Sequence, residues 1–572
     1  MASGHAPSSS QNLVPVWVIL LLGILALLCE FGAMGNPFPF SEQQFYLYGG
    51  GQILQHQIPY VDFWDRKPVG LFLLFAPIHL FGPYRFYAMP IIAGLFMWVG
   101  AIMIARITRL LSCGLFPSFL AGAVYLIGSN AYPDETAGQA EQFYIPLLIG
   151  AVLLIVQYWD RIQNSIPDLL KVGAGTMILL GMALEIKTSC VWDGVFLGIA
   201  LLVIAVRQPN FSLTQRFYAF FVCGAAWIFV ALIPTLLILA YYAAHGILHD
   251  WVWANITNHH LRSKAIGHST AFFDYHRYYA NFAKHALETC FFWGLPTLYL
   301  TYRFIALWVA KLKAKDGSFV PPLTPLFFIF AWGWVSLVAS IQLRGGYAAV
   351  HYTMAGMPAA VILGAVLWQR NLWEKIFLLL PLVYFTPQAI ATNLISFKDE
   401  VALEHKVASI LNQQPGCLFQ LSGSYLFYDL SPATSQCRVN KFLLSGMLTS
   451  PEEQFALGVN REDQFLHDLK EHPLYLVIDT CDERLSCDSR FKPQVEVKDG
   501  LWSTNAIDPK KRSAIQEIIT NDYVPVFEGK DNKQGGDYVL YKLKDRFVPG
   551  IMPPNVRPVP AEPYHEEPER DE

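Results

Sequence analysis

Long apolar runs alternate with short polar loops from about residue 13 to residue 395, and this pattern predicts membrane-spanning helices. A helix needs about 20 mostly apolar residues to cross the hydrocarbon core of a bilayer. The first run lacks the basic start of a signal peptide, so we expect it to be retained as a span. Eleven candidate spans follow from the pattern: 13–34, 87–107, 114–131, 143–159, 170–186, 190–206, 216–242, 288–309, 322–342, 354–369 and 374–394.

A shorter apolar segment, residues 69–82, directly follows a cluster of charges. Its sequence, "VGLFLLFAPIHLFG", contains a proline and is short for a span, so we expect a helix lying in the membrane interface. Just before it, the stretch "YVDFWDRKP" holds two carboxylates and two cations: Asp62, Asp65, Arg66 and Lys67. Charges placed at the edge of an apolar helix are the first candidates for chemistry in this chain.

The basic residues predict how the helices are oriented. Lys and Arg are concentrated in alternate short loops, and such loops are usually cytoplasmic. These residues are Arg106, Arg109, Arg161, Lys171, Arg207, Arg216, Lys311, Lys313, Lys315, Arg370 and Lys375. The remaining loops, 35–86, 131–142, 243–287 and 343–353, are then external. We expect a cytoplasmic N-terminus and, because the number of spans is odd, an external C-terminal domain.

From Lys398 onward the chain has the pattern of a soluble domain. The runs "YLVID" and "YVLYKL" predict strands, and "EEQFALGVNREDQFLHDLKEH" predicts a helix, so we expect a small α/β domain. The predicted organisation is a membrane domain over 1–395, an exported domain over 396–546 and a disordered, Pro- and Glu-rich tail over 547–572.

Cysteine usage agrees with export of the C-terminal domain. Five of the nine cysteines lie in or beside predicted spans, and the other four are Cys417, Cys437, Cys481 and Cys487. An even set in an exported domain predicts disulfides. We favour the pairs Cys417–Cys437 and Cys481–Cys487 among the three possible connectivities, with unpaired buried thiols as the alternative.

Composition narrows the class of protein further. The chain of 572 residues is 53% hydrophobic and 15% charged, which is typical of polytopic membrane proteins and not of soluble ones. Its net charge of −4 provides no basic field for nucleic acid. Membrane lipids are the expected surroundings.

Polar residues gather in four places along the predicted external face. Ionisable groups at membrane depth usually line a cavity or pair with one another, so four clusters on one face predict a single outward-facing polar site. A carboxylate there can act as a base, and cations can hold a phosphate leaving group. Besides the charges of 62–67, the clusters contain Glu42, then Asp134, Glu135 and Glu141, then Glu185 and Lys187, and finally Arg344, His351 and Tyr352.

The order of motifs resembles the C-type membrane glycosyltransferases, and more closely the branch with the protein O-mannosyltransferases and the lipid A aminoarabinose transferase. The matching stretches are "SEQQFY", "HQIPYVDFWDRKPVG", Glu141-Gln142-Phe143 and "HYTMAGMP". This resemblance implies the C-type fold and inverting transfer of a sugar from a polyprenyl-phosphate-linked donor. The acceptor would be a lipid, a glycan or a protein at the external face of the cytoplasmic (inner) membrane, as in lipopolysaccharide or protein glycosylation of the cell envelope.

The resemblance also assigns roles to residues. Ser41 stands where the family has its catalytic aspartate, so the base would be Glu42, which lies in the matched motif, or else Asp62 or Asp65. Lys67 matches the lysine that faces the lipid phosphate. The charge clusters themselves, and not a matched motif, suggest further phosphate contacts from Arg66, Lys187 and Arg344. Glu141, His351 and Tyr352 lie in matched stretches and would contact the substrate.

Other interpretations stay open at this point. The same charges can anchor helix ends at lipid headgroups without any chemistry. The chain can also be a transporter or flippase of lipid-linked sugars, or a non-catalytic scaffold, since Ser41 replaces an aspartate. The His-rich loop 243–287 has no tight ligand spacing and no nearby cysteine, so we expect it to cap the site and not to bind a metal. For the enzyme as a whole we expect no cofactor, with a divalent metal as the alternative.

Overall fold

The structure is a computed structural model of the whole chain. It describes residues 13–37, 41–131, 136–207, 211–258, 260–261, 287, 289–313, 323–342, 348–369, 371–394, 398–420, 425–430, 461–470, 472–479, 496–497, 501–502, 509–530 and 537–544.

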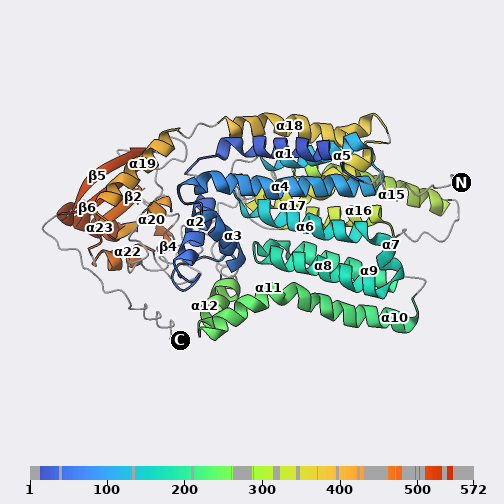
Figure 1. Cartoon of the computed structure of the whole chain (residues 1–572), viewed down its shortest axis with the longest axis horizontal. Helices are drawn as coiled ribbons and strands as arrows, with labels where there is room; N and C mark the ends of the chain where they lie inside the picture. The colour runs from blue at the N-terminus through green and yellow to red at the C-terminus, as the bar shows by residue number, and fades with distance from the viewer. Residues whose placement is uncertain are drawn as a thin grey trace.

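A bundle of long helices forms the body of the molecule, and each of the eleven predicted spans overlaps one of them (Figure 1). They are α1 (Val16–Glu30), α4 (Arg85–Leu110), α5 (Leu115–Ser129), α6 (Ala140–Gln157), α8 (Ile166–Leu184), α9 (Val191–Val206), α11 (Gly224–Ala244), α15 (Leu295–Lys313), α16 (Pro325–Gln342), α17 (Ala348–Leu367) and α18 (Ile376–Asn393). Seven helices within the described part are long and apolar enough to cross a membrane, and four more are apolar but shorter. The protein is therefore a multi-pass membrane protein, whereas the number of eleven spans stays a prediction.

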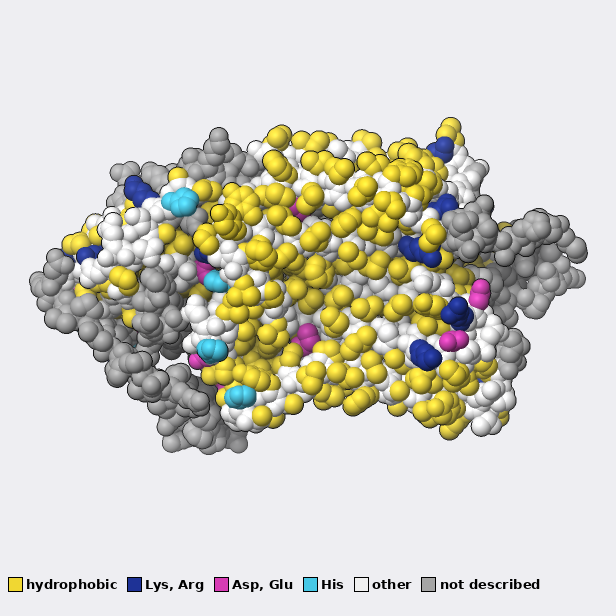
Figure 2. All heavy atoms as spheres, in the orientation of Figure 1, with side chains coloured by type: hydrophobic (Ala, Val, Ile, Leu, Met, Phe, Trp, Pro, Cys, Tyr) yellow, Lys and Arg dark blue, Asp and Glu magenta, His cyan; other side chains and the backbone are white. Residues whose placement is uncertain are grey.

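The surface of the bundle supports this placement. Figure 2 shows a broad hydrophobic band over the helices, and on the helical body the visible Lys and Arg side chains gather at the end away from the sheet. The short helices α7 (Trp159–Asn164) and α10 (Leu213–Tyr218) lie at that same end (Figure 1). Which side of the membrane each end faces stays a prediction.

Two further helices, α2 (Ser41–Leu54) and α3 (Val69–His79), lie at the opposite end, between the bundle and the C-terminal sheet (Figure 1). The predicted interfacial segment is thus a helix, α3. The two helices pack closely because Gly50 has no side chain: a Cβ there would lie 2.6 Å from the carbonyl carbon of Phe75. This contact fixes α2, which carries Glu42, against α3, which begins just after Lys67.

The C-terminal part is a small α/β unit, as expected. Its four-stranded sheet has the order β1-β2-β6-β5, in which β1 is parallel to β2 and the other pairs are antiparallel. The predicted strands "YLVID" and "YVLYKL" are β2 and part of β6. The elements are α19 (Lys398–Gln413), β1 (Leu418–Gln420), α20 (Leu426–Leu430), α22 (Arg461–Leu469), β2 (Tyr475–Asp479), β3 (Glu496–Val497), β4 (Leu501–Trp502), α23 (Pro509–Asp522), β5 (Tyr523–Lys530) and β6 (Asp537–Leu543).

The cysteines are in the predicted states as far as the structure describes them. Cys29, Cys113, Cys190, Cys223 and Cys290 are free thiols of the helical body. Cys417 is disulfide-bonded. The other three cysteines of the C-terminal domain lie outside the described residues, so the pairing stays a prediction.

The C-terminal domain docks on the membrane body through α20. The side chain of Asp429 in α20 is only 6% exposed, and it contacts both His79 Nε2 at 2.7 Å and the guanidinium of Arg85 at 2.7 and 2.9 Å. Burial alone would raise the pKa of Asp429, but the hydrogen bond from His79 and the charge of Arg85 outweigh it and lower the pKa. The carboxylate is therefore ionised at neutral pH and ties the two domains together.

Asp429→Ala is expected to loosen this docking. The substitution leaves the Arg85 guanidinium largely buried without its carboxylate, which typically costs about 3–5 kcal/mol. Amide hydrogen exchange in α20 should rise, measured by mass spectrometry on the full chain. The control is Asp522→Ala, since Asp522 pairs with His472 inside the C-terminal domain at 3.7 Å. Equal exchange in α20 for wild type and Asp429→Ala would show that the ion pairs do not hold the domains together.

Candidate functional site

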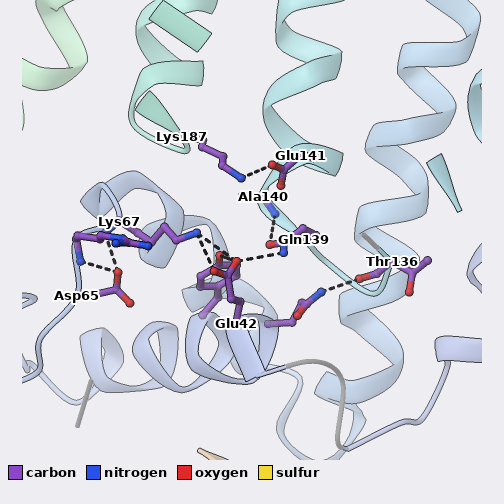
Figure 3. A network of polar contacts seen from close by, with 11 residues as sticks. Glu42, Asp65, Lys67, Thr136, Gln139, Ala140, Glu141 and Lys187 are labelled. Carbon is purple, nitrogen blue, oxygen red and sulfur yellow. Dashed lines mark hydrogen bonds and ion pairs between the residues drawn. The ribbon is translucent and has the colours of Figure 1, made fainter. Parts of the chain in front are cut away.

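Glu42 is the centre of a polar network at the end of the bundle (Figure 3). It lies in the first turn of α2, and Tyr46, one turn later on the same helix face, donates its hydroxyl to Glu42 Oε2 at 2.7 Å. Lys67 Nζ lies 3.2 and 3.3 Å from the two carboxylate oxygens. Gln139 Nε2, from the loop before α6, donates to Oε2 at 3.1 Å. A carboxylate and an ammonium group from two separate elements therefore meet at one point.

The loop before α3 holds Lys67 in place through its backbone. Asp65 Oδ1 accepts hydrogen bonds from the N–H groups of Arg66 at 2.6 Å and Lys67 at 2.8 Å. The Tyr60 hydroxyl donates to the carbonyl oxygen of Lys67 at 2.6 Å. Pro68 then caps α3 with extended backbone angles. The Lys67 side chain is 11% exposed and that of Glu42 26%, so this ion pair stays accessible from outside.

A second ion pair, between Glu141 and Lys187, lies beside the first (Figure 3). Glu141 is in the first turn of α6 and is fully buried, and Lys187 lies in the break between α8 and α9. The α3 helix approaches that break closely, because a Cβ on Gly70 would lie 2.6 Å from both the Cβ and the carbonyl oxygen of Glu185. Close packing of α3 against this break brings Lys67 and Lys187 to the same region.

Burial and neighbouring charges set the protonation of two groups in the site. Burial, and then the charges of Glu42, Asp65 and Glu141, raise the pKa of Tyr46 well above its usual value. The phenol therefore stays protonated and donates to Glu42. Burial also raises the pKa of Asp65 to about 6, although the charge and the backbone N–H of Lys67 partly offset the effect.

Asp65→Asn is expected to stabilise the protein at neutral pH. Because the folded pKa of Asp65 lies above its ordinary value of 3.8, the stability linked to its protonation is present below that value and is lost as pH rises through about 6. An asparagine avoids this loss, at most about 3 kcal/mol for a shift of about 2 units.

The measurement for Asp65 is thermal unfolding of the detergent-solubilised chain between pH 4 and pH 8. The melting temperature of Asp65→Asn should exceed that of wild type at pH 7.5, and the two should converge below about pH 4. Parallel pH profiles for the two proteins would show that Asp65 does not titrate in this window.

The structure brings together five of the ten predicted site residues. Glu42, Asp65, Lys67, Glu141 and Lys187 form the networks of Figure 3. Asp62 instead closes its own loop, since its Oδ2 accepts from the N–H of Ile58 at 2.6 Å, and Arg66 contributes its backbone N–H to Asp65.

Other predicted residues fall where the structure does not describe them. Asp134, Glu135, Arg344 and much of the His-rich loop lie outside the described residues. His351 and Tyr352 lie near the start of α17, but their side chains are outside the description. Within the described part of the chain, no three His, Cys, Asp or Glu side chains are grouped so as to hold a metal ion.

Two contributors to the site were not predicted from the sequence. Tyr46 lies four residues after Glu42, a spacing that on a helix signals a contact. Gln139 caps α6 with its side chain, which accepts from the N–H of Ala140, and also reaches Glu42. Its position before an apolar run was the only available signal, and this signal indicates a helix cap and not a site residue.

Comparison with solved structures finds likenesses to three kinds of membrane enzyme. The chain is similar to ArnT from Cupriavidus metallidurans bound to undecaprenyl phosphate, at 11% identity and a TM-score of 0.41, covering 86% of this chain and 99% of that one. It is similar to the oligosaccharyltransferase AglB from Archaeoglobus fulgidus, in complex with an inhibitory peptide and a dolichol-phosphate, at 11% identity and a TM-score of 0.46, covering 82% and 71%.

A third likeness is to the S. cerevisiae protein O-mannosyltransferase Pmt1-Pmt2 complex bound to the sugar donor, at 16% identity and a TM-score of 0.34. It covers 42% of this chain, which spans only 35% of that one. No protein-family model and no curated protein matches the sequence. Since all three TM-scores are below 0.5, we base the proposed function on the residues of the chain itself.

Proposed function

We propose that the protein is a glycosyltransferase that uses a polyprenyl-phosphate-linked sugar. The observation that carries this proposal is the meeting of Glu42 and Lys67, 3.2 Å apart, where α2 reaches the start of the apolar helix α3. A base and a phosphate-binding cation at the edge of a membrane helix suit a donor whose tail stays in the bilayer. The motif order noted in the sequence supports the same chemistry.

The reaction would be a single displacement at the anomeric carbon. Glu42 takes the proton of an acceptor hydroxyl or amine, and the acceptor atom forms a bond to the anomeric carbon. The bond from that carbon to the phosphate oxygen breaks, and its electrons leave with the polyprenyl phosphate. Lys67 offsets the charge that grows on the leaving phosphate, with Lys187 as a second cation nearby. Attack opposite to the leaving group inverts the configuration.

Tyr46 and Gln139 would orient the base. Both donate to Glu42 Oε2, so the carboxylate is held on one side by neutral groups while Lys67 contacts both oxygens. When a donor phosphate binds Lys67, the two neutral donors keep Glu42 fixed. The positive charge of Lys67 serves the role that a divalent cation has in other transferases, so we propose that the reaction needs no metal.

We further propose that the site faces the outside of the cytoplasmic membrane, with a glycan, lipid or protein as acceptor. The site lies at the end of the bundle that also carries the C-terminal domain, and the basic helix ends lie at the other end (Figures 1 and 2). This arrangement follows the positive-inside rule if the basic end is cytoplasmic.

The test is turnover by the purified chain in nanodiscs. Undecaprenyl-phosphate and dolichyl-phosphate carrying radiolabelled hexoses and pentoses are offered with cell-envelope extracts as acceptor, with and without EDTA. We expect transfer from at least one donor, inhibition by undecaprenyl phosphate, and no loss with EDTA. Absence of transfer from every donor, together with movement of the intact lipid-linked sugar between the leaflets of a vesicle, would support a flippase instead.

A further inference from the structure

Glu30, the last residue of α1, is a buried carboxylate beneath the loop that leads into α6. It is fully buried, and it accepts hydrogen bonds from Gln142 Nε2 and from the N–H of Ala137 at 3.2 Å. The neighbouring helix α4 leaves room for it at Gly94, where a Cβ would lie 3.2 Å from Glu30 Cγ. Burying an ionisable residue at the end of a membrane helix costs free energy, so such a residue usually has a structural or functional role.

Gln142 continues the contact into the loop. Its Oε1 accepts from the N–H of Gly138 at 2.7 Å and from that of Gln139 at 3.2 Å. The loop has a left-handed backbone at Ala137, with φ of 60°, and at Gly138, with φ of 96°. A non-glycine residue adopts such angles only when its surroundings hold it there. Glu30 and Gln142 supply that support.

The loop in turn contacts α2 at two points. The Gln139 side chain donates to Glu42 Oε2 at 3.1 Å. The carbonyl oxygen of Thr136 accepts from Gln43 Nε2 at 3.0 Å (Figure 3). A continuous series of hydrogen bonds therefore runs from the end of α1, through the loop, to the carboxylate that the proposed function uses as its base.

We propose that Glu30 is a positioning residue, which holds Glu42 in its working orientation through Gln142 and the loop 136–139. The role in catalysis rests on the proposed function. Glu30 touches no reacting group. Without its two acceptor oxygens, the left-handed loop relaxes, the Gln139 amide stops donating to Glu42, and the base loses one of its two neutral donors.

A pair of swapped substitutions isolates this role. Glu30→Gln places an amide N–H where an acceptor is required, and Gln142→Glu places two carboxylates against each other. In the double variant Glu30→Gln/Gln142→Glu the polarity is complementary again. The new amide accepts from Ala137 and donates to the new carboxylate, and this carboxylate accepts from Gly138 and Gln139. Every contact of the series is thus hydrogen-bonded again, with the bond between positions 30 and 142 reversed in direction.

Two readouts are measured on the full chain in nanodiscs. Amide hydrogen exchange at residues 137–139 should rise about tenfold in each single variant and return towards wild type in the double variant. With the donor found in the turnover assay, each single variant should lower kcat about 10–100-fold with little change in donor KM, and the double variant should recover it. Glu30→Gln should add little to Gln139→Leu, because the two act through one contact.

Each other outcome is decisive. Unchanged exchange at 137–139 in Glu30→Gln overturns the inference, whether or not the chain transfers sugar. Three results would show a merely structural effect and would also overturn the inference. They are faster exchange with unchanged kcat, losses of kcat that are fully additive with Gln139→Leu, and a double variant whose kcat is no higher than that of the single variants. If wild type uses no polyprenyl-phosphate sugar, the proposed function fails, and the exchange data alone decide whether Glu30 holds the loop.

Discussion

Glu42→Gln is expected to lower kcat about 10³-fold, with a change in donor KM of less than about threefold. The amide has the shape of the carboxylate, and its oxygen can still accept from Tyr46, which donates at 2.7 Å in the wild type. It cannot take a proton from the acceptor. The loss therefore falls on the chemical step and not on donor binding, and it is measured by transfer rates over a range of donor concentrations.

The matched control for this substitution is Glu374→Gln. Glu374 is a buried carboxylate outside the site, between α17 and α18, and like Glu42 it accepts from a tyrosine and pairs with a cation: Tyr299 at 2.7 Å and Arg303 at 3.0 Å. The melting temperature of Glu374→Gln reports any loss of stability. Its kcat per folded molecule should stay close to that of the wild type. If Glu42→Gln keeps more than about a tenth of the wild-type kcat, Glu42 is not the base, and Asp65 becomes the candidate to test.

Lys67→Met is expected to lower kcat/KM about 10²–10³-fold, with a clear rise in donor KM. Methionine keeps most of the length of the side chain and removes the charge that would hold the donor phosphate. Glu42 remains hydrogen-bonded to Tyr46 and Gln139, so the site should keep its shape. The measurement is the transfer rate together with the affinity for undecaprenyl phosphate alone.

Lys171→Met is the control for charge removal, because Lys171 is an exposed residue of α8 outside the network. Lys67→Arg should recover part of the donor affinity, since it restores the positive charge with a different shape. An unaltered affinity for undecaprenyl phosphate in Lys67→Met would remove Lys67 from the donor site and leave the Glu42 ion pair as a structural contact.

Much of the helical body could be predicted because hydrophobic runs report directly on burial in a membrane. The break between two spans at Glu185 and Lys187 is an example, since α8 ends at Leu184 and α9 begins at Val191. In the C-terminal domain the alternating pattern located β2 and β6. It missed β5, which contains Pro525 at an irregular register, and β1, which has only three residues. Of the predicted helix around 452–472, the described part is α22 (Arg461–Leu469).

The candidate site could be predicted only where its charged residues are close in sequence or where an ionisable residue lies beside an apolar span. Asp65 and Lys67 lie two residues apart, and Glu141 and Lys187 stood out as ionisable groups beside spans. Gln139 is neutral and lies 97 residues from Glu42, so no local pattern connects them. Asp429 and His79 are 350 residues apart, and their contact depends on how two domains dock. Tertiary packing brings such pairs together, and the hydrophobic periodicity of a single sequence does not reveal them.

The helix that carries Glu42 is shared by two domains. On the side of the C-terminal domain, Phe45 packs edge-on against Tyr425 with ring centroids 5.0 Å apart, and Tyr48 lies against Tyr428 at 5.9 Å. A chimera that joins this membrane body to a foreign C-terminal domain would therefore leave α2 with unmatched aromatic rings. Grafting experiments on this protein should move α2 and the C-terminal domain together as one cassette.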